Sequence, residues 1–164
     1  MTRYLRIAAV AASIAPLAAV HAAGVPLELA LEAAHTAISA CKANGYNVTV
    51  TILDPDLSTR VVMRGDGAPE GTVQIGYRKA YTVIKTGMSS AEFGKSVPAP
   101  PAPPAGAPPG PPGPVNGDPN LITWAGGLPI RSGGALLGSM SVSGAPGGDK
   151  DEACVKAGLE KIEK

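Results

Sequence analysis

The strongest constraint on the fold is a proline-rich segment in the second half of the chain. Ten of the seventeen residues from Pro98 to Pro114 are proline, and alanine and glycine supply the rest. Such a segment has few backbone donors and no large apolar side chains, so it can join neither a sheet nor a core. We interpret residues 97–119 as a low-complexity, polyproline-type insert. It is either a solvated loop or a ligand for a proline-recognising partner, and the fold must form from the segments on either side of it.

The first residues have the pattern of a bacterial secretory signal peptide. Arg3 and Arg6 precede an uncharged apolar stretch, and Val20-His21-Ala22 places small residues at the two positions that a signal peptidase reads. The stretch is shorter than the roughly 20 residues that a membrane-spanning helix needs, so cleavage is preferred over anchoring. We expect a signal peptide at 1–22, or one residue longer. The mature domain, 23–164, is expected to have no membrane span and to be periplasmic or secreted.

The charge balance excludes one class of partner. Cleavage removes Arg3 and Arg6 from the 14 basic residues and leaves 12 against 13 acidic ones. A near-neutral chain lacks the basic surface that nucleic-acid binding requires. We therefore expect no nucleic-acid partner.

Periodicity predicts helices and strands in a fixed order. Apolar residues recur at helical spacing from Leu27 to Cys41, within about 72–86, and from Val155 to Ile162. Asp149 and Glu152 are expected to form a capping box at the last helix. Strand patterns predict five strands, at residues 48–53, 60–64, 121–125, 126–131 and 136–143. The simplest architecture that buries all these faces is an α/β fold in which helices flank a five-stranded antiparallel sheet.

The two cysteines lie on the predicted first and last helices. Cys41 falls on the apolar stripe of the first helix, and Cys154 lies near the start of the last. They lack Cys-x-x-Cys spacing, which argues against a redox dithiol or a structural zinc site. In an oxidising compartment a bridge can form and persist. We hypothesise a disulfide between Cys41 and Cys154 if these helices pack side by side.

Three short, glycine-rich or basic blocks of sequence follow one another along the chain. They are Arg64-Gly65-Asp66-Gly67-Ala68, Arg78-Lys79-Ala80-Tyr81-Thr82 and Ala125-Gly126-Gly127-Leu128-Pro129-Ile130. With a glycine-rich final strand and an acidic helix start, they resemble the GlcG/HbpS-type family of haem-binding and haem-degrading proteins over nearly the whole mature chain except the insert. The resemblance implies a profilin-like or roadblock-like fold, assembly into homo-oligomers, and binding of haem or a related tetrapyrrole. Some members degrade haem or release iron.

The predicted second helix offers the most groups to such a ligand. Tyr77, Tyr81 and Thr82 supply oxygen atoms, while Arg78 and Lys79 could pair with propionate carboxylates. The resemblance to haem-binding relatives singles out Thr82 as the haem contact. The alternative interpretation of Tyr77 is that it is a core residue, because it lies on the apolar stripe of the predicted helix.

Four further candidate residues lie outside that helix. Asp66, in the glycine-flanked loop before it, either caps the helix or orients a ligand-binding residue. His35 is the only histidine left after cleavage, and Glu32 precedes it with the Glu-x-x-His spacing that can chelate iron. Glu28 shares that side of the first helix. Iron capture by these three residues is one hypothesis, and a solvated helix face is the other.

The sequence therefore predicts an exported protein that binds haem, sequesters haem or iron, or assists haem degradation. A binding role is favoured over dedicated catalysis, because the chain has no histidine pair and no convincing acid/base constellation. We assign no catalytic residue. The alternative is a sensory or accessory module that binds a small organic acid, a corrinoid or a partner protein.

Overall fold

A computed structural model describes residues 24–98, 106 and 113–162. Its elements in chain order are α1 (Leu27–Ala43), β1 (Thr49–Leu53), β2 (Thr59–Arg64), α2 (Thr72–Thr86), α3 (Ser90–Ser96), β3 (Gly127–Ser132), β4 (Ala135–Ser143) and α4 (Gly148–Leu159). The predicted signal peptide and most of the predicted insert lie outside the described residues, so both remain predictions. None of the described helices is long and apolar enough to cross a membrane.

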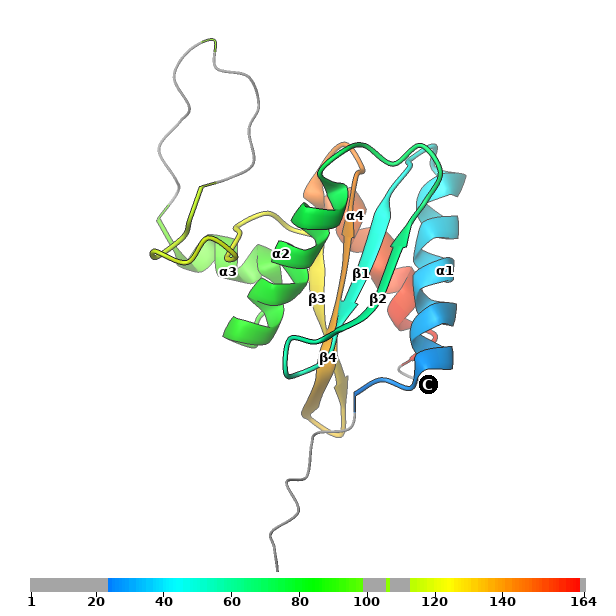
Figure 1. Cartoon of the computed structure of the whole chain (residues 1–164), viewed down its shortest axis with the longest axis horizontal. Coiled ribbons are helices and arrows are strands. Elements are labelled where there is room, and N and C mark those ends of the chain that lie inside the picture. Colours follow the sequence, from blue (N-terminus) through cyan, green and yellow to red (C-terminus); the bar gives the residue numbers. More distant parts are fainter. Residues whose placement is uncertain (1–23, 99–105, 107–112, 163–164) are drawn as a thin grey trace, which may run out of the picture.

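The described strands form one four-stranded antiparallel sheet in the order β2-β1-β4-β3 (Figure 1). The prediction of a fifth strand at 121–125 is wrong, because side chains of α2 occupy the backbone groups of that segment. Thr82 Oγ1 accepts a hydrogen bond from the Ile122 N–H at 3.0 Å, and Arg78 Nη2 donates to the Leu121 carbonyl at 2.9 Å. Backbone groups bonded in this way are not available to a strand ladder.

Helix α3 was not expected from the short polar segment that follows α2. A capping box starts it: the Glu92 N–H donates to Ser89 Oγ at 3.1 Å, and the Ser89 N–H donates to Glu92 Oε2 at 2.9 Å. The next residue, Ser90, accepts from the Gly127 N–H through its hydroxyl at 2.9 Å. This bond ties α3 to the start of β3 at the edge of the sheet.

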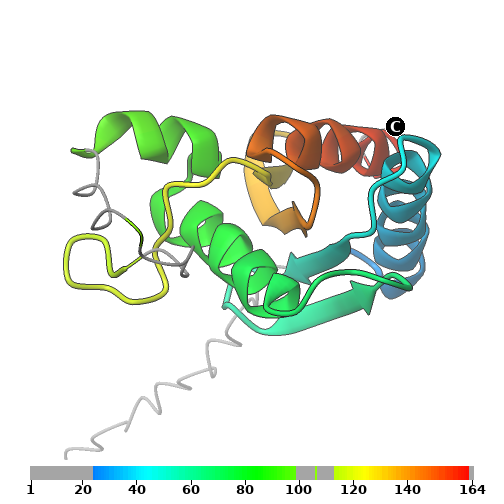
Figure 2. The ribbon, with the colours of Figure 1, turned by 90° about the horizontal axis from the view of Figure 1, so that it is seen from above.

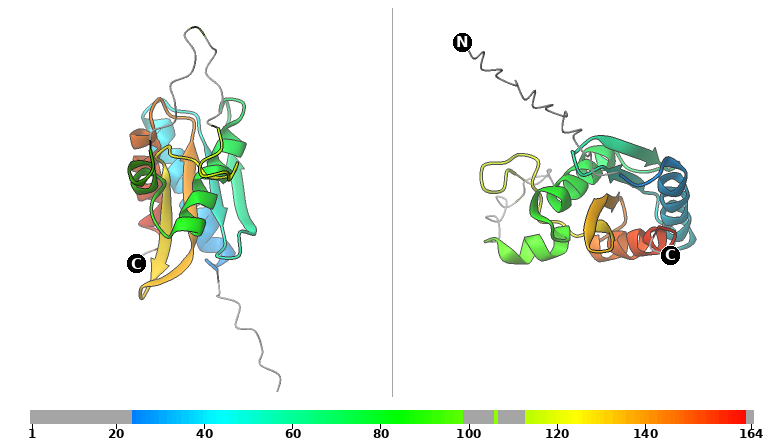
Figure 3. Two further views of the ribbon diagram at one scale, coloured as in Figure 1. Left: turned by 90° about the vertical axis from the view of Figure 1, so that its left-hand side faces the viewer. Right: turned by 90° about the horizontal axis from the view of Figure 1, so that it is seen from below.

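Helices cover both faces of the sheet. Helices α1 and α4 lie side by side on one face, and α2 lies on the other (Figures 2 and 3). Side chains alternate along β1 accordingly: Val50 and Ile52 belong to the apolar core under α1 and α4, whereas Thr49 and Thr51 face α2.

Hydroxyl groups line the interface between α2 and the sheet. Ser139 donates to the Ala80 carbonyl at 2.9 Å, and Ser141 donates to the Gly76 carbonyl at 2.7 Å. Gly76 permits this close approach, because a Cβ at that position would lie 2.9 Å from Thr51 Oγ1. The bonds hold α2 at a fixed position over β4, and thereby fix the side chains that α2 carries.

Small residues allow α1 to pack closely against α4. The buried residues of α1 are Ala30, Ala33, Ala34, Ala37 and Cys41, and a disulfide joins Cys41 to Cys154 of α4 with 5.5 Å between the Cα atoms. The predicted apolar stripe is wrong in part, since Leu27 is 48% and Leu31 37% exposed. The two leucines therefore do not belong to the buried face of α1, which consists of the alanines and Cys41.

Candidate functional site

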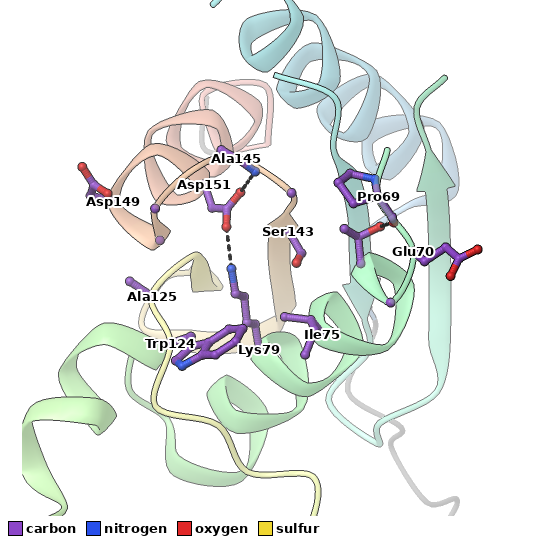
Figure 4. Close-up of a pocket in the computed structure, with 15 residues that line it drawn as sticks. Pro69, Glu70, Ile75, Lys79, Trp124, Ala125, Ser143, Ala145, Asp149 and Asp151 are labelled. Carbon is purple, nitrogen blue, oxygen red and sulfur yellow. Dashed lines mark hydrogen bonds and ion pairs between the residues drawn. The ribbon is translucent and has the colours of Figure 1, made fainter. Parts of the chain in front are cut away.

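A cavity of about 590 Å³ opens where the starts of α2 and α4 meet the end of β4 (Figure 4). The loop residues Trp124 and Ala125 border it on one side, and Pro69 and Glu70, just before α2, border it on the other. Its volume lies within the roughly 300–1,000 Å³ of typical small-molecule pockets.

One part of the cavity lining is apolar. Trp124 is the only tryptophan of the chain and is 45% exposed. It lines the cavity together with Ile75, Pro69 and Ala125, and Figure 4 places Trp124 and Ile75 on either side of Lys79. An exposed indole beside a cavity offers a flat apolar surface to an aromatic or macrocyclic ligand.

A buried ion pair forms another part of the lining. Lys79 Nζ lies 2.6 Å from Asp151 Oδ2 and donates to the Val142 carbonyl at 3.0 Å. Asp151 Oδ1 accepts from the Ala145 N–H at 2.9 Å. Burial lowers the pKa of Lys79 and raises the pKa of Asp151, while the attraction between the two groups opposes both shifts. Because Lys79 is neutralised by Asp151, it is not a free cation for a ligand carboxylate.

Two consecutive glycines make room for this ion pair. A Cβ at Gly126, whose φ is +111°, would lie 2.7 Å from Asp151 Cβ and 2.8 Å from Lys79 Nζ. A Cβ at Gly127 would lie 2.7 Å from the Lys79 carbonyl oxygen. The Gly126-Gly127 pair therefore serves the close approach of the loop backbone to α2 and α4.

Both helices that start at the cavity lack a capping side chain. The N-cap residues of α2 and α4 are Gly71 and Gly147, and neither helix start has a side-chain capping hydrogen bond. The capping box predicted from Asp149 and Glu152 is therefore wrong, because α4 begins at Gly148 after a glycine N-cap. Uncapped first-turn N–H groups, together with the helix dipoles, favour an anionic group at this place.

The structure does not gather the predicted ligand-binding residues in one place. Of the six, only Lys79 lines the cavity. Thr82 is fully buried, donates to the Arg78 carbonyl at 2.9 Å and accepts from the Ile122 N–H. Its hydroxyl is thus enclosed between α2 and the segment that carries Ile122.

Arg78 and Tyr81 bind the described last part of the predicted insert and the residues that follow it. Arg78 is 6% exposed and donates to the carbonyls of Gly113 and Leu121. The Tyr81 hydroxyl donates to Asp118 Oδ2 at 2.9 Å. This hydrogen bond is the main cause that raises the pKa of Tyr81, and a raised pKa disfavours the phenolate form that binds haem iron.

Tyr77 and Asp66 also lie outside the cavity lining. Tyr77 is partly buried, and its ring centroid lies 6.0 Å from that of Tyr81. Asp66 is exposed and does not cap α2. It borders a separate cavity of about 240 Å³, whose lining includes Lys42 and Arg64.

The three residues of the predicted iron site are exposed on α1. Glu32 lies 3.5 Å from Lys161 Nζ, between their charged atoms, and Glu28 and His35 face solvent. Within the part of the chain that the structure describes, no group of three or more histidine, cysteine, aspartate or glutamate residues could hold a metal ion. The structure therefore does not assemble Glu28, Glu32 and His35 into a metal site.

Sequence reasoning missed Trp124, Ser143 and the two glycine N-caps as cavity residues. Trp124 could have been found, because it is the single tryptophan of a chain with 4% aromatic residues and directly precedes the Ala125-Gly126-Gly127 block. Ser143 could not have been singled out in this way, because it is one of several serines that alternate along β4. The partnership of Lys79 with Asp151 spans 72 positions and leaves no trace in local spacing.

Comparisons with known proteins agree with this fold. A family model described as Haem degrading protein HbpS-like matches residues 25–160. The chain is similar to a double mutant of HbpS from Streptomyces reticuli, with a TM-score of 0.72 and 26% identity over 95% of this chain and 100% of that chain. No curated protein matches the sequence.

Two more distant structures share the fold. The Klebsiella pneumoniae protein ORFY has a TM-score of 0.72 and 18% identity, over 92% of this chain and 97% of that one. PduOC, solved as a complex with heme, has a TM-score of 0.70 and 18% identity, over 85% of this chain and 95% of that one.

Proposed function

The chain belongs to the HbpS-like family of haem-degrading proteins, and from this premise we propose that it binds haem in the cavity between the starts of α2 and α4. The observation that carries the proposal is that an apolar wall and two uncapped helix starts meet in one cavity of about 590 Å³. Haem has the matching chemistry, because it combines a flat apolar macrocycle with two propionate carboxylates. The heme complex of PduOC, which shares the fold, adds support.

The part of the lining that the structure describes offers groups that suit the macrocycle and its carboxylates, but it offers no strong ligand for the iron. Trp124, Ile75 and Pro69 offer apolar surface to the ring. Among the described residues that line the cavity there is no histidine, cysteine, methionine or tyrosine, the side chains that commonly ligate haem iron. The hydroxyls of Thr72 and Ser143 are the neutral oxygen groups that remain. We therefore expect the iron of bound haem to have no strong axial ligand from this cavity.

We propose more specifically that the protein sequesters haem or iron outside the cytoplasm. It would also assist the degradation of the haem that it binds. The signal-peptide pattern at 1–22 supports export, and the description of the family supports degradation. The Lys79–Asp151 pair that lines the cavity is engaged in its own ion pair, which favours binding over dedicated acid/base catalysis. Assembly into homo-oligomers remains a prediction, which light scattering on the mature chain tests.

Titration of the mature chain with hemin, followed in the Soret region, tests the binding proposal. We expect a saturable shift to a high-spin ferric spectrum. Ile75→Asp places a charge on the apolar wall and should weaken binding by about tenfold or more. Val73→Asp is the matched control, because Val73 lies on the same helix, is 42% exposed and is not part of the lining. Absence of saturable binding, or equal weakening by both variants, would contradict the proposal.

Degradation is tested on the haem-loaded chain. Iron release can be measured with a ferrous chelator in the presence of a reductant and catalase, so that free peroxide cannot cause it. Release of iron with loss of the Soret band would establish degradation by this chain. A persistent Soret band under the same conditions would leave sequestration as the function.

A further inference from the structure

The hydroxyl of Ser143, the last residue of β4, is reachable from the cavity and makes no hydrogen bond to another described residue. The residue is 5% exposed and lines the cavity, and its hydroxyl points from β4 toward α2 in Figure 4. Within the described chain, no side-chain or backbone group forms a hydrogen bond with this hydroxyl. Because the protein uses neither the oxygen nor the proton of this hydroxyl, both are available to a group that enters the cavity.

The neighbouring hydroxyls show that Ser143 still has a proton to donate. Thr72 Oγ1 donates to the Pro69 carbonyl at 2.8 Å. Its other hydroxyl contact, to Thr49 Oγ1 at 2.8 Å, must therefore use the Thr49 proton, since a hydroxyl has only one. Thr49 lies directly opposite Ser143 in the pairing of β1 with β4. The hydroxyl protons of Thr72 and Thr49 are therefore both used in hydrogen bonds within the protein, and neither hydroxyl can donate to a ligand.

The surroundings of Ser143 favour an acceptor with a single negative charge. The uncapped starts of α2 and α4, at Gly71 and Gly147, line the same cavity. In the lining, as far as the structure describes the chain, Lys79 is the only basic residue, and it is already paired with Asp151. The carboxylates of Glu70 and Asp149 point away from the cavity in Figure 4. Hydrogen-bond donors without a free cation suit a carboxylate better than a phosphate dianion.

We propose that Ser143 and the first-turn N–H groups of α2 and α4 form a carboxylate-binding subsite. The expected occupant rests on the proposed function: it is a propionate of haem, which this subsite would orient toward the two helix starts while the ring packs on Trp124. A small organic carboxylate presents the same chemistry, so the test includes both sources.

The test compares hemin with its dimethyl ester, in which both propionates are esterified. Ser143→Ala should weaken hemin binding by about tenfold, because one hydrogen bond to a charged group is lost, and should leave binding of the ester unchanged. Ser139→Ala is the matched control: Ser139 is a buried serine on the same face of β4, but its hydroxyl is bonded to the Ala80 carbonyl. It should lower stability and leave the affinity for hemin unchanged.

The outcomes separate this subsite from the proposed function. If wild type binds hemin and Ser143→Ala binds hemin and ester as tightly as wild type does, the subsite is wrong and haem binding stands. Equal weakening for both ligands also overturns the subsite. If wild type binds no hemin, calorimetric titration with acetate and succinate decides: binding that Ser143→Ala weakens supports the subsite without haem, and absence of binding overturns it.

Discussion

Lys79 Nζ and Asp151 Oδ2 lie 2.6 Å apart and connect α2 and α4, which cover opposite faces of the sheet. The pair closes around the end of β4, where Lys79 also donates to the Val142 carbonyl. Since the starts of the same two helices line the cavity, this ion pair fixes the position of one cavity wall relative to the other. The shape of the candidate site therefore depends on two side chains that are themselves almost inaccessible.

Loss of one partner of this pair should destabilise the fold strongly. Asp151→Asn leaves the Lys79 charge buried without its counter-charge, and we expect a loss of about 3–5 kcal/mol in the free energy of unfolding. The double variant Lys79→Met, Asp151→Leu removes both charges and should recover most of that loss. Urea unfolding measures both. A single variant that costs less than about 1 kcal/mol, the value of an exposed pair, would contradict this role.

Removal of the lysine should give stability a new pH dependence. In Lys79→Met the burial that raises the pKa of Asp151 is no longer opposed by Lys79. The folded state then binds a proton more readily than the unfolded state, so the free energy of unfolding should rise as the pH falls from neutral through the raised pKa. Lys156→Met is the control, because Lys156 forms an exposed pair with Glu152. Parallel pH profiles for the two variants would rule out this effect.

Gly126 should tolerate no side chain. Gly126→Ala must place a methyl group against Asp151 and Lys79 in a backbone with a φ of +111°, and we expect a loss of more than about 3 kcal/mol in unfolding free energy. Gly133→Ala separates strain from crowding, because Gly133 has a φ of +54° and open space around it. That control should cost about 1 kcal/mol. Similar costs for the two variants would show that crowding at Gly126 is absent.

The disulfide should contribute substantially to stability. Cys41→Ala with Cys154→Ala should lower the unfolding free energy by about 2–5 kcal/mol, because the bridge constrains the unfolded chain over a separation of 113 residues. Thiol titration of the denatured protein provides the chemical check. No free thiol is expected before reduction and both cysteines should react after it, whereas two thiols in the unreduced protein would disprove the bridge.

Local patterns predicted most of the fold, and long-range bonds account for what they missed. The helical spacing of residues 72–86 corresponds to α2, and the strand patterns near 48–53, 60–64 and 136–143 correspond to β1, β2 and β4. The expected strand at 121–125 failed because Thr82 and Arg78, about 40 positions earlier, bind its backbone. No periodicity reports such bonds.

The site was predicted less well, for a related reason. Residue chemistry nominated Tyr81, Arg78 and Thr82, all of which have partners of their own between residues 113 and 122, at the end of the insert and just after it. A sequence shows which residues can bind a ligand but does not show which of them are already engaged. Lys79 illustrates the same point, since it reaches the cavity with its charge already neutralised.

The central claim is the position of haem, and a crystal structure of the mature chain with hemin tests it most directly, with the iron located by anomalous scattering. The account predicts one iron peak in the cavity bordered by Ile75, Trp124 and Ser143. An iron peak beside Tyr77 and Tyr81, or at His35 on α1, with the cavity free of haem, would contradict it.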